Sequence, residues 1–432
     1  MDPQDSVRKG KRRERRIKFL LLIGSLLVSL AIVETGLRLA GYSYPEFYVA
    51  DLRRGYALRP EMEGWYRKEG AAFVHVNSDG LRDREHTKDK PANTLRVAVL
   101  GDSFIEALQV PFEESFCAVL ERKLKECSAT SGRNVEVINF GVSGYGTAQE
   151  LITLRDHVWQ YSPDIVLLAI TTNNDVSDNA RALKKTDEIP YFVWRDGRLI
   201  EDDSFQQTRT FRWRNSALNR VGGWFRDHLR VIQLINQAAH GFRIYLAQRK
   251  TAGAQGGSAQ GQNAGSSSPS PEQTPRPVRP DGVRAAEELG VDNLVYREPA
   301  DAVWNDAWKV TEQLITVMNR EVQSKGAKFF VVTLSNGIQV WPDPAARATF
   351  LQGVGGRDIF YPDNRFRDFC VSQQVPVDIL APAMQKYADE KRIFLHGFGA
   401  DPGNGHWNIN GHRLAAELTA EKLCDFLMNS TP

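Results

Sequence analysis

The sequence of 432 residues predicts an α/β fold in which helices cover both faces of a parallel sheet. The first observation is that three apolar runs, LRVAVL, VEVINF and DIVLLAI, alternate with helix-length segments between residues 94 and 182. The second is that the alternation resumes after residue 301 with a helical pattern and the apolar runs AKFFVVTLS and VPVDIL. The third is that a polar motif follows each of the first three runs, where a buried strand would end.

These motifs are GDSF at Gly101–Phe104, NFGVSGYG at Asn139–Gly146 and NNDVSDN at Asn173–Asn179, and a fourth, GHWNINGH, lies at Gly405–His412. In an open parallel sheet, ligands bind beyond the carboxyl ends of the strands, where the connecting loops gather. We therefore expect the first three motifs to converge on one site, to which the fourth supplies a histidine.

The residue types in the motifs indicate acyl transfer. Ser103 is the expected nucleophile and His406 the general base that takes its proton. The backbone N–H groups of Ser103 and Gly144 and the side-chain amide of Asn174 are the expected donors to an oxyanion. Taken singly, each motif also fits a plain turn or helix cap. Their occurrence in order at successive strand ends favours a catalytic site.

The four motifs resemble those of the SGNH/GDSL hydrolase superfamily, and in particular its membrane-anchored bacterial members, which share a lead-in like NSDGLRDRE at Asn77–Glu85. Ser103 matches the family's nucleophile, Gly144 its glycine, Asn174 its asparagine and His406 its histidine. The resemblance implies a three-layer α/β/α flavodoxin-like domain and the hydrolysis or transfer of acyl esters.

The sequence departs from the family pattern at two places. Asn173 occupies the position that usually holds a glycine, next to Asn174. The acid that usually lies two or three residues before the histidine is missing, because those positions hold Asn404 and Gly403. We expect Asp401 to orient His406 through a bent loop. The alternatives are a backbone carbonyl that orients the ring, or weak activity. The second histidine of the motif, His412, is expected to be a helix residue.

The N-terminus predicts a single-pass signal anchor. Eight Lys or Arg residues lie between Arg8 and Lys18, and the uncharged run Phe19–Val33 follows them. Glu34 and Arg38 are spaced to pair near the far interface. The basic cluster predicts a cytoplasmic N-terminus, with the catalytic domain on the outer side of the membrane. The resemblance implies that this is the bacterial inner or cell membrane and that the domain is periplasmic or extracellular. A cleaved signal peptide is the alternative, but no small-x-small cleavage site follows the apolar run.

A long insertion is expected to separate the two halves of the catalytic domain. Residues 205–250 hold nine Lys or Arg against one Asp, interleaved with aromatic and aliphatic residues. They indicate one of two structures. The first is a basic amphipathic element that lies on a membrane surface or on an anionic glycan, and the second is a set of helices that cap the active-site side. The Gly/Ser/Pro-rich stretch near 253–282 predicts a disordered loop. The expected segments are a basic tail (1–16), the anchor (17–40), a lead-in (41–93), the hydrolase domain (94–182 and 301–430) and the insertion (183–300).

Composition narrows the classes further. The 55 basic and 53 acidic residues nearly balance, which argues against nucleic acid as a partner. The sequence contains no CxxC motif or His/Cys cluster that would indicate a metal site. It also contains no phosphate-binding or dinucleotide-binding loop that would indicate a cofactor. Cys117 and Cys127 lie too far apart along one expected helix to pair, whereas the pairing of Cys370 with Cys424 is left open.

The sequence thus favours a membrane-anchored extracytoplasmic serine esterase that cleaves acyl or acetyl esters, carried on a glycan or a lipid. One alternative is an O-acyltransferase that passes the same acyl group to a cell-surface glycan. The other is a non-catalytic module that binds glycan or protein through a degenerate site, which the missing aspartate makes conceivable. The oligomeric state is left open.

Overall fold

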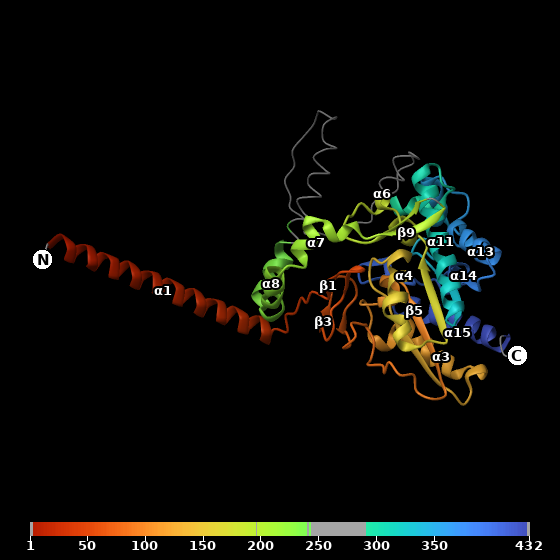
Figure 1. The fold of residues 1–432 in the computed structure, drawn as a ribbon, viewed down its shortest axis with the longest axis horizontal. Coiled ribbons are helices and arrows are strands. Elements are labelled where there is room, and N and C mark those ends of the chain that lie inside the picture. The colour runs from red at the N-terminus through yellow and green to blue at the C-terminus, as the bar shows by residue number, and fades with distance from the viewer. Residues whose placement is uncertain (1–2, 196, 240–241, 243–290, 430–432) are drawn as a thin grey trace. The chain divides into compact units, whose positions relative to one another are not determined.

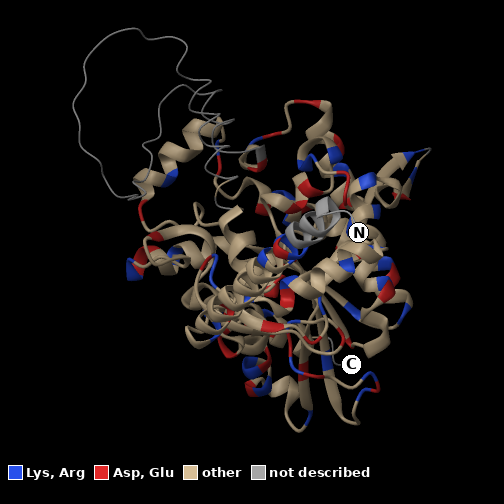
Figure 2. Cartoon of the chain, turned by 90° about the vertical axis from the view of Figure 1, so that its left-hand side faces the viewer, with Lys and Arg blue, Asp and Glu red and all other residues tan. Residues whose placement is uncertain are grey.

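The computed structural model describes residues 3–195, 197–239, 242 and 291–429 (Figure 1). The stretch near 253–282, for which the sequence predicts a disordered loop, lies outside these residues. The chain divides into two compact units, one formed by Met1–Glu46 and Ala217–Glu272 and the other by Phe47–Ser216 and Gln273–Pro432. The larger unit carries the sheet. Basic and acidic residues are interspersed along the described parts of the chain (Figure 2).

The larger unit is built on a five-stranded sheet with the order β11-β10-β7-β5-β6, and all neighbours pair in parallel. Numbered along the chain this is the order 2-1-3-4-5 of flavodoxin-like sheets, so the predicted parallel sheet is confirmed. The strands are β5 (Thr94–Leu100), β6 (Asn134–Asn139), β7 (Ile165–Thr171), β10 (Lys328–Leu334) and β11 (Val377–Ile379).

Helices cover both faces of this sheet, which confirms the three layers. Every residue of β5 and β7 is buried, as expected for strands packed on both sides. Ala98 and Leu100 join the apolar cluster on one face, and Val97 and Val99 join the cluster on the other. The first face packs on α4 (Thr147–Asp156), α11 (Ala302–Ser324) and α13 (Tyr361–Ser372), the second on α3 (Phe116–Glu126), α14 (Ala381–Lys391) and α15 (Ile409–Asn429).

The lead-in forms two small antiparallel hairpins that precede the sheet. The first pairs β1 (Tyr48–Asp51) with β2 (Gly55–Leu58), and the second pairs β3 (Glu63–Tyr66) with β4 (Ala72–His75). Alternate residues of β4 are buried, and Val74 packs with Leu108 in a third apolar cluster. The second hairpin is therefore held close to the loop that follows α2.

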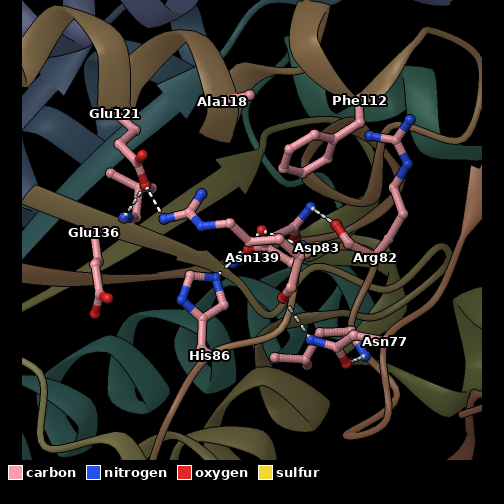
Figure 3. A network of polar contacts seen from close by, with 12 residues as sticks. Asn77, Arg82, Asp83, His86, Phe112, Ala118, Glu121, Glu136 and Asn139 are labelled. Carbon is pink, nitrogen blue, oxygen red and sulfur yellow. Dashed lines mark hydrogen bonds and ion pairs between the residues drawn. The ribbon is translucent and has the colours of Figure 1, made fainter. Parts of the chain in front are cut away.

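A network of polar contacts ties the segment after β4 to the sheet (Figure 3). The side-chain oxygen of Asn77 accepts a hydrogen bond from the backbone N–H of Leu81 at 2.9 Å, which closes the NSDGL turn. The Asp83 carboxylate accepts from the backbone N–H of Asn139 at 2.9 Å, and Arg84 pairs with Glu121 at 2.6 Å. The lead-in is thereby fixed against the end of β6 and against α3.

The remaining elements of the larger unit are short. Two further antiparallel hairpins occur, β8 with β9 and β12 with β13. The bounds are α2 (Ser103–Glu106), α5 (Asn174–Asp178), α6 (Arg181–Lys184), β8 (Tyr191–Arg195), β9 (Arg198–Asp202), α7 (Arg209–Arg214), α12 (Pro344–Val354), β12 (His396–Phe398) and β13 (Asp401–Trp407).

The smaller unit contains the N-terminal helix α1 (Pro3–Leu39) and α8 (Ala217–His228), followed by a helical stretch at residues 230–239. Within α1, Arg13–Leu39 is long and apolar enough to cross a membrane, and no residue of its most apolar part is buried. Length and composition alone do not separate an anchor from a signal sequence.

One disulfide joins Cys127, directly after α3, to Cys424 in α15. The pairing of Cys370 with Cys424, left open by the sequence, is therefore wrong. Cys370 is a free, buried thiol on α13, in the helix layer on the other face of the sheet from α15. Cys117 is also free and buried.

We predict that the double variant Cys127→Ser, Cys424→Ser has a free energy of unfolding about 2–4 kcal/mol lower than that of the wild type. The reason is that the disulfide closes a loop with a sequence separation of 297 residues. Denaturant unfolding with and without reductant measures this. Reductant should lower the unfolding midpoint of the wild type towards that of the variant and leave the variant unchanged. An equal effect of reductant on both proteins would contradict the assignment.

Candidate active site

Ser103 lies at the turn from β5 into the short helix α2. Asp102 caps this helix, because its carboxylate accepts the backbone N–H of Phe104 at 3.0 Å. Asp102 and Phe104 are buried, whereas Ser103 between them is only partly buried. The turn therefore presents the hydroxyl of Ser103 to solvent while the residues on either side are fixed in the core.

His406 lies in β13 and faces this hydroxyl. A hydrogen bond of 2.7 Å joins its Nε2 to Ser103 Oγ, so the structure brings the predicted nucleophile and base together. The ring centroid of His406 lies 5.1 Å from that of Phe104, the residue after the nucleophile. This contact restricts the movement of the imidazole about the position in which it meets the serine.

The other ring nitrogen of His406 contacts Glu69, in the loop between β3 and β4. Glu69 Oε2 lies 2.5 Å from Nδ1, and Oε1 accepts the backbone N–H of His406 at 2.7 Å. One carboxylate therefore fixes both the ring and the backbone of the same residue. A Cβ at position 405 would collide with Glu69 Oε1, so the glycine before His406 allows this close approach.

Asp401, the acid that the sequence favoured for this role, does not fill it. It is exposed at the start of β13, and its carboxylate accepts a hydrogen bond of 2.6 Å from the side chain of Asn404. Glu69 occupies the place beside Nδ1, although it lies 337 residues before His406 in the chain. The sequence offered no signal for it, because Glu69 stands in a charged RKEG turn that resembles any solvated loop.

The electrostatics of the pair favour a proton on the imidazole. Burial lowers the pKa of His406, but the hydrogen bond and the charge of Glu69 outweigh this effect, and the net shift of the pKa is upward. Burial likewise raises the pKa of Glu69, and its contacts with His406 reverse the sign, so that its pKa lies below the usual value. Glu69 thus stays ionised and stabilises the imidazolium.

Asn174 is the first residue of α5, directly after β7, and is partly buried. Its Nδ2 donates a hydrogen bond of 2.9 Å to the carboxylate of Asp102. Asp102 therefore holds both the turn of Ser103 and the side chain of Asn174. Because an amide nitrogen carries two hydrogens, a second N–H of Asn174 remains for another acceptor.

Gly144 lies in a turn after β6 with φ of +76°, a conformation that favours glycine. A Cβ at this position would lie 2.7 Å from the hydroxyl of Tyr56. That hydroxyl donates a hydrogen bond of 2.8 Å to the backbone carbonyl of Ser143. The turn of Gly144 is therefore held from one side by β2, where Tyr56 lies.

A buried carboxyl group, Glu106, supports the same turn from within. It accepts hydrogen bonds from the hydroxyl of Tyr48, at 2.9 Å, and from the hydroxyl of Ser143. Burial raises the pKa of Glu106 to about 7, against the opposing effect of these two donors. Glu106 is the last residue of α2, so it links the helix of Ser103 to the turn of Gly144. The sequence did not indicate this role.

Two further histidines near the site stay neutral. His396 Nδ1 lies 2.8 Å from the carbonyl oxygen of Gly405, and burial lowers the pKa of His396 to about 4. His412 is a buried residue of α15, and burial holds its pKa well below the usual value. His406 is thus distinguished by its acidic partner. Among the described residues, no three His, Cys, Asp or Glu side chains lie together as ligands of a metal ion would.

The sequence of the chain is similar to that of a known protein over a short segment only. No protein-family model matches the chain. It is 35% identical over 79 residues to an arylesterase from Vibrio mimicus, and this match spans 18% of the chain and 38% of the arylesterase. The chain thus matches well under half the length of that relative.

Solved structures show a distant likeness. An acetyl xylan esterase named AlAXEase is 12% identical with a TM-score of 0.34, over 77% of this chain and 99% of its own. The acetylxylan esterase Axe2 from Geobacillus stearothermophilus is 11% identical with a TM-score of 0.35, over 76% of this chain and 94% of its own. TM-scores this low carry no argument about the class of protein to which the chain belongs. The order of the four motifs and the parallel sheet resemble those of the SGNH/GDSL hydrolase superfamily.

We predict that Glu69→Gln lowers kcat by about 10²- to 10⁴-fold, because the amide no longer holds the productive tautomer of His406. The acid limb of kcat/KM should also move to lower pH. His406 must be neutral to accept a proton, Glu69 raises its pKa, and burial, which lowers the pKa, remains in the variant. Rates with a chromogenic acetyl ester between mild acid and mild base measure both effects.

The matched control for this experiment is Asp401→Asn, which removes the acid that contacts Asn404 but leaves His406 and Glu69 in place. It should keep the rate and the pH profile of the wild type. A loss in Asp401→Asn as large as that in Glu69→Gln would contradict the assignment of the acid.

Proposed function

We propose that this protein is a membrane-anchored serine esterase that faces the outside of the cell and cleaves acyl or acetyl esters through an acyl-serine intermediate. The observation that carries the proposal is the chain of contacts from Ser103 Oγ through His406 to Glu69, at 2.7 and 2.5 Å. A nucleophile, a base and an acid that orients the base are what this chemistry requires.

In the first step, His406 Nε2 takes the proton of Ser103 Oγ as this oxygen bonds to the carbonyl carbon of the ester. Glu69 stabilises the imidazolium that forms. The N–H groups of Ser103 and Gly144 and the free N–H of Asn174 are the proposed donors to the oxygen that becomes negative. Asp102 and Glu106 support these donors, because they hold the three segments that carry them.

The tetrahedral intermediate then collapses, and His406 returns the proton to the leaving alcohol as the ester bond breaks. Water deprotonated by the same imidazole attacks the acyl-serine and releases the acid. The partial arylesterase match supports an ester as the substrate. A sugar hydroxyl in place of water would complete an O-acyl transfer from the same intermediate, so analysis of the products with and without glycan acceptors distinguishes the two acceptors.

Two independent features support the location outside the cell. The apolar segment of α1 follows a cluster of basic residues, which favours a cytoplasmic N-terminus and an exported C-terminal part. The bond between Cys127 and Cys424 is typical of an oxidising compartment, such as the periplasm or the extracellular space.

We predict that a fluorophosphonate probe labels the full-length protein and that Ser103→Ala abolishes the labelling, because the probe needs an activated serine. His406→Ala should slow the labelling strongly. The control is Ser372→Ala, since Ser372 is an exposed serine at the end of α13, where its hydroxyl bonds to the carbonyl oxygen of Phe369 and to the side chain of Gln373. Gel fluorescence of the purified protein measures all four.

The proposal fails if the folded wild type does not react at any pH from mild acid to mild base. That result would favour a binding module that has kept the geometry of an esterase. Labelling that persists in Ser103→Ala would place the reactive nucleophile elsewhere.

A further inference from the structure

The far end of α1 is joined by hydrogen bonds to the two consecutive helices of the smaller unit, α8 and residues 230–239 (Figure 1). Glu34 Oε2 accepts the backbone N–H of Val231 at 3.0 Å, in the first turn of the second helix. Arg38 donates to the carbonyl oxygen of His228, the last residue of α8, at 2.5 Å. An acid thus meets a helix N-terminus and a base meets a helix C-terminus, which are the favourable pairings.

The chain that leaves α1 strengthens this junction. The backbone N–H of Tyr44 donates to Gln233 at 2.8 Å, and Arg230 donates to Ser43 at 3.3 Å. Arg226 of α8 pairs with Glu46 at 3.4 Å. The two helices are therefore fixed to the last turns of α1 and to the residues just after it.

This junction lies where the apolar segment of α1 ends. The uncharged run of α1 stops at Val33, and Glu34 is the next residue. Charged side chains are expensive inside the hydrocarbon layer and collect at its boundary. If α1 crosses the membrane, α8 is consequently held at the level of the lipid headgroups.

The outer surface of α8 is apolar and exposed. Leu218, Val221 and Trp224 recur at intervals of three residues, so they share one face of the helix, and Phe225 lies beside them. Leu218 is 73% exposed and Trp224 56% exposed. The next helix adds Leu234 and Ile235, which are exposed as well.

A helix of this composition suits an interface. Tryptophan is enriched at the level of the headgroups, and an amphipathic helix buries its apolar face at the boundary between headgroups and acyl chains. The exposed side chain of Arg220, on the same helix, suits the phosphates of the headgroups. A water-soluble partner would have to compete with the bilayer to which the helix is already tethered through α1.

We propose that α8 lies on the outer surface of the membrane that α1 crosses, with Leu218, Val221, Trp224 and Phe225 inserted among the lipid headgroups. This inference rests on the proposed membrane anchoring. It makes the basic, aromatic segment of the insertion a second membrane contact, beside the transmembrane helix.

The test uses full-length protein in phosphatidylcholine vesicles, with one polarity-sensitive fluorophore attached to an introduced cysteine. The native cysteines are either buried or bonded to each other, so they do not compete for the label. Leu218→Cys carries the test label on α8. Leu27→Cys, which is 61% exposed on α1, reports the anchor, and Val371→Cys, 64% exposed on α13, reports the larger unit.

We predict a blue-shifted emission and quenching by brominated lipid for the labels at positions 27 and 218, and neither effect at position 371. Bromine near the headgroup end of the acyl chains should quench the label at 218 more strongly than bromine near their methyl ends. The opposite order is expected for position 27, because Leu27 lies within the apolar run.

The outcomes separate the inference from the proposal on which it rests. If the label at 27 is not quenched, the anchoring itself is wrong. If the label at 27 is quenched while that at 218 stays in water, α1 spans the bilayer but α8 does not touch it, and the inference alone is overturned. Equal quenching at 218 and 371 would also overturn it, because α8 would then not be a specific contact.

Discussion

The parallel pairing of β5 with both β6 and β7 determines where the first three motifs of the site lie. Val99 is in register with Asn139, and Leu100 with Leu168, so the three strands end at the same edge of the sheet. The chain winds away in opposite directions from β5 and β7, and this change of direction opens the crevice that α/β proteins use for ligands. Ser103 and Asn174 stand on either side of it. The carboxylate of Asp102 bridges the gap with one hydrogen bond to each side.

The acid that contacts His406, the proposed base, comes from outside this sheet. In the expected arrangement the acid and the histidine share one loop, and here Glu69 arrives on a hairpin that precedes the sheet in the chain. Such a distant contact needs its own support. The hairpin is supported by the apolar packing of Val74 and by the polar network that joins Asp83 to the end of β6. The lead-in is therefore part of the site, and its position is as important as that of the strands.

How far the sequence predicts this structure depends on whether a feature is local. The strands, their parallel order and the meeting of Ser103 with His406 follow from apolar runs and from motifs at their ends, which are local patterns with a geometric consequence. The contact of Glu69 with His406 and the bond from Cys127 to Cys424 are not predictable in this way. Each joins segments about 300 residues apart or more, and no motif surrounds Glu69 or either cysteine. Asp401 was favoured only because it was near in the chain. The domain boundaries predicted from composition stay a prediction.

The buried carboxyl group of Glu106 gives the site a second dependence on pH. Burial raises its pKa from the usual value to about 7, so the folded state keeps this proton where the unfolded chain has lost it. The contribution of this proton to the stability of the fold is fully present below the pKa that Glu106 has in the unfolded chain. It is lost as the pH rises towards 7. The proposed role of His406 needs a higher pH, because an imidazole can act as a base only when it is neutral. The charge of Glu106 also raises the pKa of His406, so ionisation of the first group delays the loss of the proton from the second. The position of the buried carboxyl thus couples the packing of the Gly144 turn to the proton affinity of the base.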